Sequence, residues 1–569
     1  MSLYSYSFGN RLAATGIVAR HGILPIALLA VLHLAAIVVM ARYEYDIVPK
    51  TAFILTWGIL NFFWLAVLRR PAIAAALSLA MIAILVLLSE LKYQVLWMTV
   101  SFVDVMIIDT DTIAFLFTIF PNLGSIIATI AVLIIPVMAL LWWLDPFRIR
   151  LRSALAGKSA CLVGLTGLSF AVTIEPHDAF YGNNHVSGFA RSGVAAISEL
   201  LTHGLMESDA EVNDRLKSLV DLTCTPAAKP PHIIMVHDES SFDIRSAPGI
   251  NVPPGYGAHF KSFDGKIRNF LVEAAGGASW YAEYNVLTGL SARSFGRFSY
   301  FVTRIAARRV ARGLPNALRR CGYRTFSLYP ALGAFMSARS FQATTGMQKF
   351  VDSDGMRANG LEPDKFYYDT ATRMIDSEHR KGPMFVFVYL AANHFPWDWR
   401  FRSDLLPEWR DLDNTPEVNE YLRRQAMSVQ DYAAFLAGLK RDFPDESFLL
   451  VRYGDHQPDF ASHIMEPSLD EAGIARRLMT FDPKYYTTYY AIDAINFKPV
   501  DMSSALDTLD GPYLPLVVQE AAGLPLDPSF EEQKKILKRC GGLFYACNGG
   551  AEARRFNRLL IDAGLIKHL

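Results

Sequence analysis

The sequence predicts an α/β protein in two parts, an N-terminal domain of five transmembrane helices and a mostly parallel sheet covered by helices on both faces. Two observations carry this prediction. Long apolar runs fill the first third of the 569-residue chain, and short apolar strands alternate with helical patterns after residue 229. At 52% hydrophobic and 19% charged residues, the chain is also too apolar for an ordinary soluble protein.

Five apolar segments are long enough to cross a bilayer, which takes about 20 helical residues. They lie at 23–42, 51–68, 71–89, 123–144 and 159–175. A further apolar stretch, 97–120, carries Asp104, Asp109 and Asp111, and charges at mid-membrane are costly. We therefore expect 97–120 to be re-entrant or interfacial, with a sixth span as the alternative.

Basic residues predict the orientation of these spans. With an inside N-terminus, the inner loops hold eight basic residues and the outer loops three. The inner residues are Arg11, Arg20, Arg69, Arg70, Arg148, Arg150, Arg152 and Lys158, and the outer ones are Arg42, Lys50 and Lys92. Five spans then place everything after about residue 176 outside the cytoplasm, whereas six would place it inside. We expect no cleavable signal peptide, because the first apolar run is too long.

The predicted domains are a transmembrane domain at 1–176, a helical connector at 177–228 and an outer domain at 229–569. Within the connector, 188–222 has helical apolar spacing with charges between, which fits a helix on the membrane surface or an ordinary linker. A cluster of prolines ends it, namely Pro226, Pro230 and Pro231.

In the outer domain, the sequence predicts alternating strands and helices. Buried strands are predicted at 232–237, 324–329, 384–390 and 447–453, and helices at 314–321 and 424–440. This alternation favours a parallel sheet, in which ligands gather at the carboxyl ends of the strands.

The chain has five cysteines. Cys161 lies in the last predicted span, and the other four lie in the outer domain, where disulfides persist. Cys540 and Cys547 flank two glycines and are expected to close a short loop. A bridge between Cys224 and Cys321 has weaker support, and four free thiols are the alternative.

Three predicted strands end in side chains that bind metals or phosphate. These ends are His237-Asp238-Glu239-Ser240-Ser241, Asn393-His394-Phe395-Pro396 and Gly454-Asp455-His456. A single such end is usually a cap or a loop charge, but three in one domain are expected to converge at one edge of the sheet. Carboxylate and imidazole ligands together suit Zn²⁺ or Mn²⁺.

A nucleophile is predicted at Ser279. It follows Gly276, Gly277 and Ala278 and begins a helical run, whose free N–H groups attract phosphate. Bound to a divalent cation, a serine hydroxyl loses its proton near neutral pH and attacks phosphorus. The alternative is a purely structural role, in which Ser279 only caps the helix. Thr288, deeper in the same run, is a rival nucleophile.

These motifs resemble those of the lipoteichoic acid synthases and the phosphoglycerol and phosphoethanolamine transferases, a membrane branch of the alkaline phosphatase and sulfatase superfamily. In that family an E-S pair, a G-x-T-x-x-x-E stretch and a Y-G-D-H stretch carry the ligands and the nucleophile. The matching residues here are Glu239-Ser240, Gly277 to Glu283 with Ser279 in place of Thr, and Tyr453 to His456.

The resemblance implies a metal held by Glu239, Ser279, Asp455 and His456. It also implies that His394 binds substrate and that Arg339, at a looser spacing, contacts the phosphoryl group. His463 falls where the family often has another His, which protonates a leaving group or binds a second metal. The expected cofactor is a divalent metal, Mn²⁺ or Zn²⁺.

The resemblance further implies transfer of a phospho-alcohol head group from a membrane phospholipid to a glycan or lipid-glycan acceptor, in the periplasm at the bacterial inner membrane. The motif layout favours phosphoglycerol over phosphoethanolamine. Sulfate ester hydrolysis is disfavoured, because Trp280, Tyr281 and Ala282 follow Ser279 where sulfatases have C/S-x-P-x-R.

Two other classes stay open at this stage, a metal-dependent phosphodiesterase or phosphatase that uses water, and a non-catalytic scaffold. A nucleic-acid partner is disfavoured, because 55 basic and 55 acidic residues leave no net charge and no basic stripe.

Overall fold

The computed structural model describes residues 23–96, 98–172, 182–212, 215–216, 224–226, 228–567 and 569. The chain forms two compact units, Met1–Thr202 and His203–Leu569. The first unit is helical in the described residues, and the second contains the sheet.

Five helices of the first unit are long and apolar enough to cross a membrane. They are α2 (Ile23–Tyr43), α3 (Ile47–Leu68), α4 (Pro71–Leu96), α7 (Leu123–Leu144) and α8 (Leu151–Ala171). Between α4 and α7 lie only two short helices, α5 (Phe102–Met106) and α6 (Thr110–Ile119), within the part of the chain described there. At 5 and 10 residues, neither reaches the length of a span. The prediction of five spans is confirmed.

The last span begins earlier than predicted, at Leu151 rather than 159. The charges of Arg152 and Lys158 pointed to a loop there, but the helix includes both. The Lys158 ammonium lies 5.3 Å from the centre of the Phe63 ring of α3, which gives this charge an aromatic partner. Close packing of α3 and α8 also depends on Gly157, because a Cβ there would lie 2.6 Å from the Phe62 ring.

The described helix in the predicted connector is α9 (His185–His203), which is shorter than the 188–222 segment with helical spacing. Gly204 follows it at φ 75°, a left-handed conformation that commonly ends a helix. Residues 177–181, 213–214, 217–223 and 227 of the connector lie outside the described residues.

The second unit is built on an eight-stranded sheet in the order β4-β3-β5-β1-β6-β7-β2-β8. The strands are β1 (His232–Asp238), β2 (Arg268–Leu271), β3 (Arg324–Leu328), β4 (Lys349–Val351), β5 (Met384–Tyr389), β6 (Phe448–Gly454), β7 (Thr487–Ile495) and β8 (Thr508–Asp510). Pairing from β4 through β6 is parallel, and β7 is antiparallel to both its neighbours. The predicted mostly parallel sheet is confirmed, and the four predicted strands lie next to one another in it as β3-β5-β1-β6.

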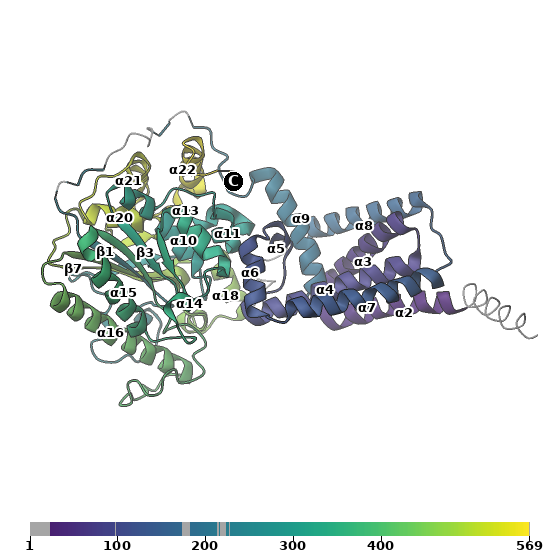
Figure 1. The fold of residues 1–569 in the computed structure, drawn as a ribbon, viewed down its shortest axis with the longest axis horizontal. Coiled ribbons are helices and arrows are strands. Elements are labelled where there is room, and N and C mark those ends of the chain that lie inside the picture. Colours follow the sequence, from purple (N-terminus) through teal and green to yellow (C-terminus); the bar gives the residue numbers. More distant parts are fainter. Residues whose placement is uncertain are drawn as a thin grey trace, which may run out of the picture. The chain divides into compact units, whose positions relative to one another are not determined.

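Helices cover both faces of this sheet (Figure 1). The α-helices described in the second unit are α10 (Trp280–Thr288), α11 (Val302–Ala306), α12 (Leu314–Arg320), α13 (Ala338–Thr345), α14 (Ser353–Met356), α15 (Asp364–Glu378), α16 (Pro416–Asp442), α17 (Ala461–Met465), α18 (Glu471–Met479), α19 (Pro483–Tyr486), α20 (Leu514–Ala521), α21 (Pro528–Cys540) and α22 (Ala551–Asp562). Figure 1 shows α15 and α16 on one face and α10, α13 and α20 on the other.

The core of the second unit lies between the central strands and these helices. Ile234 and Val236 of β1 pack in one buried cluster with Tyr367 of α15 and Phe435 of α16. Because β1 has neighbours on both sides and helices above and below, all seven of its residues are buried. This burial explains the unbroken apolar run from Ile233 to Val236 between the two histidines of the strand.

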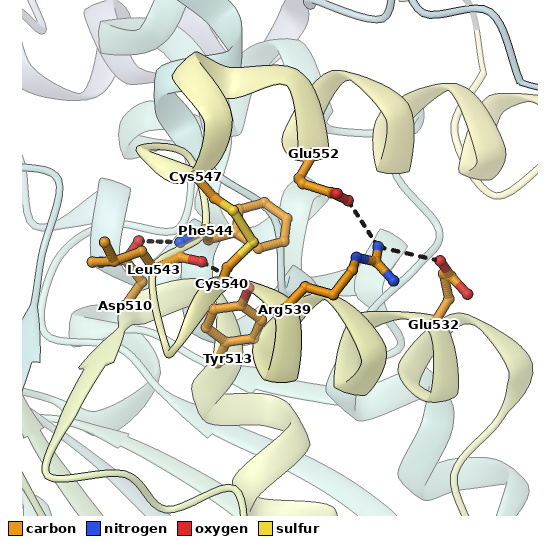
Figure 2. Close-up of a disulfide and its surroundings, with 9 residues drawn as sticks. All are labelled: Asp510, Tyr513, Glu532, Arg539, Cys540, Leu543, Phe544, Cys547 and Glu552. Carbon is orange, nitrogen blue, oxygen red and sulfur yellow. Dashed lines mark hydrogen bonds and ion pairs between the residues drawn. A yellow bond between two sulfur atoms is a disulfide. The ribbon is translucent and has the colours of Figure 1, made fainter.

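Two disulfides close the second unit. Cys540 is bonded to Cys547 and Cys224 to Cys321, which confirms both expected pairs, and Cys161 is free. Figure 2 shows the Cys540–Cys547 bridge over the loop that follows α21, where Phe544 N–H donates to the half-buried Asp510 carboxylate at 2.5 Å.

Candidate metal centre

The candidate centre forms where β1 and β6 end side by side. The two strands are parallel, and Asp238 pairs with Gly454, so Glu239 and Asp455 leave the sheet at the same edge. Gly454 is required for this approach, because a Cβ there would lie 1.8 Å from the Ser241 carbonyl oxygen. The ends of β1 and β6 can therefore meet as predicted only because residue 454 has no side chain.

The Asp455 carboxylate is fully buried and held from two sides. Its Oδ1 accepts from the backbone N–H of Ser240 at 2.7 Å and of His456 at 2.8 Å. Its Oδ2 lies 3.1 Å from His237 Nε2 and 3.3 Å from His456 Nε2. Burial raises the pKa of Asp455, but the two histidines outweigh it and hold the pKa below its usual value.

Ser279 enters the centre from the start of α10. Gly276, Gly277 and Ala278 all have positive φ, which turns the chain sharply before the helix. The Ser279 Oγ lies 3.3 Å from Glu239 Oε2 and 3.1 Å from His456 Nε2. Its side chain makes no capping hydrogen bond, so the interpretation of Ser279 as a helix cap alone is wrong.

The two imidazoles differ in which nitrogen is available. A backbone carbonyl only accepts, so His456 Nδ1 donates to Gln457 O at 2.8 Å and Nε2 faces Ser279. His237 Nε2 donates to the Asp455 carboxylate, and its Nδ1 accepts from the Tyr453 hydroxyl at 2.7 Å. His456 therefore has the geometry of a ligand, whereas His237 orients a ligand.

The centre carries more negative than positive charge. Burial lowers the pKa of His456, but the Asp455 and Glu239 carboxylates outweigh burial and raise it to about 9. The donor set is two carboxylates, an imidazole and a hydroxyl, nearly all of it buried, and this set fits a divalent cation such as Zn²⁺ or Mn²⁺. A geometric group of His237, Glu239 and Asp455, with ligand atoms within 4.8 Å of one another, falls at the same place.

His394 lies at the same edge of the sheet, in the segment after β5, which is parallel to β1. Its Nδ1 donates to the Phe395 carbonyl at 2.8 Å and its ring stacks on Phe395. One turn of α16 holds this segment and the β1 end together. Arg424 donates to the His394 carbonyl at 2.7 Å, and the Tyr421 hydroxyl donates to the Ser240 carbonyl at 3.0 Å.

Arg339 and His463 have partners elsewhere. Arg339 on α13 is half exposed and pairs with Asp352 at 2.5 Å. His463 on α17 is also exposed, and Glu471 is its nearest carboxylate at 3.8 Å. The hydrogen bonds and ion pairs of the described residues connect neither side chain, nor that of His394, to Ser279 or to the two carboxylates. Their predicted roles stay predictions.

The sequence did not predict the hydrogen bonds that hold the end of β1 on its other side. Asp238 Oδ2 accepts from the Tyr489 hydroxyl at 2.5 Å and from His259 Nε2 at 3.1 Å. Arg452 Nη1 donates to His259 Nδ1 at 3.2 Å, which leaves the proton on Nε2. Asp238, His259 and Tyr489 thus satisfy one another as a structural network, although as residue types they resemble a ligand set. The Asp238-Glu239 pair was the only signal in the sequence.

Thr288, the rival nucleophile, lies away from these ligands. It is the last residue of α10, fully buried, and its hydroxyl donates to the Tyr284 carbonyl at 2.6 Å. The hydroxyl proton, which a nucleophile would have to lose, is therefore held in this hydrogen bond.

Residues 274–488 match the family model for sulfatases. The matched residues lie within the second unit and cover less than half of the chain. The match begins just before Ser279 and ends inside β7, so it includes the turn that leads into Ser279 and the Asp455-His456 pair. No curated protein matches the chain.

Among solved structures, the chain is similar to a phosphoglycerol transferase from Streptococcus pyogenes in complex with sn-glycerol-1-phosphate. That similarity has 16% identity and a TM-score of 0.45, over 61% of this chain and 87% of the other. It is also similar to lipooligosaccharide phosphoethanolamine transferase A from Neisseria meningitidis, an integral membrane protein. That similarity has 13% identity and a TM-score of 0.45, over 83% of this chain and 95% of the other. In the present chain the residues that match the sulfatase model follow five apolar helices.

Proposed function

We propose that this protein is a membrane-anchored, metal-dependent transferase. It moves a phospho-alcohol head group, phosphoglycerol in preference to phosphoethanolamine, from a membrane phospholipid to a glycan or lipid-glycan acceptor outside the bacterial inner membrane. The covalent carrier is Ser279.

One observation carries this proposal, the position of the Ser279 hydroxyl. It lies within 3.3 Å of both Glu239 and His456 at a buried, acidic centre, and it is not used as a cap. A serine in such a place is a candidate nucleophile rather than a structural residue. The motif resemblance and the sulfatase family match agree with this interpretation.

The reaction has two displacements at phosphorus. In the first, Ser279 Oγ loses its proton and forms a bond to phosphorus, while the bond from phosphorus to the diacylglycerol oxygen breaks and that oxygen takes up a proton. In the second, an acceptor hydroxyl bonds to phosphorus, gives up its proton, and Ser279 leaves and is reprotonated. A bound divalent cation would lower the pKa of the Ser279 hydroxyl and neutralise charge on the phosphoryl oxygens.

The protein's own residues set up this chemistry. Glu239, Asp455 and His456, with Ser279, would hold the cation, and His237 keeps Asp455 oriented through its Nε2–H. We assign His394 and Arg339 to the phosphate, and His463 to the leaving group or to a second metal. Roles of this kind are each worth about 10²–10⁴-fold in rate.

The membrane helices favour a lipid donor. A catalytic domain tethered to the bilayer meets lipid head groups at high effective concentration, without a separate binding step. The excess of basic residues in the predicted inner loops supports an outward-facing domain, as do the two disulfides in that domain.

The proposal is tested by intact-mass analysis of the full chain in detergent, after exposure to phosphatidylglycerol or to phosphatidylethanolamine. The mass of the adduct identifies the head group. We expect the adduct to be lost in Ser279→Ala and kept in Thr288→Val, which removes the rival hydroxyl from the same helix. An adduct that survives Ser279→Ala would refute the assignment.

The alternative is a membrane-anchored phosphodiesterase or phosphatase that uses water in the second step. The same centre serves both reactions, so the products decide between them. Labelled glycerol on a glycan together with released diacylglycerol favours transfer, and free phosphoglycerol favours hydrolysis. A scaffold role predicts neither product and no bound metal in purified protein.

A further inference from the structure

One turn beyond Ser279 on α10 lies a fully buried carboxyl group, that of Glu283. Its Oε1 accepts a hydrogen bond from Gln342 Nε2 at 2.9 Å. Gln342 is also fully buried and lies on α13, so this bond joins the helix that begins at Ser279 to a neighbouring helix.

Each partner in this pair has one atom without a hydrogen bond. Within the described part of the chain, neither Glu283 Oε2 nor Gln342 Oε1 has a donor. Both are acceptors if Glu283 is ionised, and leaving a buried acceptor unsatisfied destabilises the folded state. A single proton on Glu283 Oε2 would satisfy both atoms, with the acid O–H donating to the amide oxygen while the amide N–H donates to the acid.

The surroundings favour that proton. The titratable groups that interact electrostatically with Glu283 include the phenols of Tyr329, Tyr389 and Tyr453, from the ends of β3, β5 and β6, and none of these phenols carries positive charge. Burial raises the pKa of Glu283 to about 8, and only the Gln342 hydrogen bond opposes this effect. A group this far above its usual pKa stays protonated at neutral pH.

The geometry points to Glu283 as a neutral carboxylic acid that pairs with Gln342 through two hydrogen bonds and holds the nucleophile helix in register against α13. It is a positioning residue, because it acts through α10 on Ser279. The neutral form also keeps a further negative charge out of a region that already holds Glu239 and Asp455. Its effect on turnover rests on the proposed function, but its protonation state does not.

The first test uses no substrate. Infrared difference spectra of the full chain at pH 7, wild type minus Glu283→Gln, are expected to show the carbonyl band of a protonated acid. Other buried acids cancel in this difference. Absence of the band would overturn the proposal, whatever reaction the protein catalyses.

The second test is thermal unfolding as a function of pH. The Glu283 pKa lies above its unfolded value of 4.5, so wild type loses stability as pH rises from there to about 8, and loses no more above it. In the Glu283→Gln variant, the new amide would pair with the Gln342 amide and would not titrate. The difference in Tm, Glu283→Gln minus wild type, is therefore expected to grow up to about pH 8 and then level off.

Two variants distinguish a positioning role of the Glu283 carboxyl group from the effect of a buried side chain at this position. Glu283→Leu keeps the site apolar but leaves both Gln342 groups unpaired, and we expect a lower Tm at every pH. If Ser279 forms the proposed adduct, the rate of adduct formation in Glu283→Gln relative to wild type should rise above pH 8. A Tm difference that does not change with pH would show that Glu283 is ionised or that its charge has no effect.

Discussion

The Ser279 hydroxyl lies 3.1 Å from Nε2 of His456, the nitrogen that remains when Nδ1 donates to the Gln457 carbonyl. The ring of this histidine is thus held by its own backbone, and its Nε2 faces the candidate nucleophile. A small change at either residue is expected to affect chemistry far more than folding.

Replacing Ser279 tests this relationship directly. Ser279→Ala removes the hydroxyl and should lower head-group release by at least about 10³-fold, because the covalent route is lost. Ser279→Thr keeps the hydroxyl and should retain most activity, as the related motif carries Thr. The measurement is release of diacylglycerol from labelled phospholipid. Equal activity in Ser279→Ala and wild type would contradict the assignment.

Metal content should depend on Asp455. Asp455→Asn keeps an oxygen for the backbone donors but removes the charge that a cation needs, so we expect loss of bound metal and about 10²–10⁴-fold lower activity. Elemental analysis of purified protein gives the readout. Asp459→Asn is the matched control, because Asp459 is an exposed residue four positions along the same segment.

His237 should act on metal affinity rather than on the chemical step. His237→Gln and Tyr453→Phe each weaken the chain of hydrogen bonds that orients Asp455, and loss of such a partner typically costs about 10–100-fold in metal affinity. Activity should then return when metal is added in excess. If excess metal fails to restore His237→Gln, His237 is itself a ligand.

Gly454 should tolerate no side chain. In Gly454→Ala the new Cβ would lie 1.8 Å from the Ser241 carbonyl oxygen, so strands β1 and β6 must separate. We expect destabilisation of about 3 kcal/mol or more, at the upper end for overpacking. Gly438→Ala, inside α16 with contacts no closer than 3.9 Å, should instead stabilise by about 0.5–1 kcal/mol. Denaturant unfolding compares the two.

The two disulfides should contribute unequally. Cys540 and Cys547 are 7 residues apart, whereas Cys224 and Cys321 are 97 apart. Loop entropy predicts about 2–3 kcal/mol for the short loop and about 4–5 kcal/mol for the long one. Paired Cys→Ser variants, unfolded under non-reducing conditions, measure both. A larger loss from the short loop would show that local packing dominates.

Three residues of the candidate centre, Glu239, Ser279 and Asp455, could be named from the sequence because each follows an apolar strand or a glycine turn. Glu239 and Asp455 stand directly after strands that are buried on both faces, and Ser279 stands after two glycines. Neighbouring parallel strands end at the same edge of a sheet, so the order of these motifs predicted that they meet. The five spans followed from apolar length alone.

What only the tertiary structure decided is the set of contacts between residues far apart in the chain. The role of His237 depends on Tyr453 and Asp455, more than 200 positions away, and the pairing of Glu283 with Gln342 depends on how α10 packs on α13. Local patterns record which side chains are buried, because burial follows strand and helix periodicity. They do not record which buried polar atoms face one another, because that depends on packing across the whole domain.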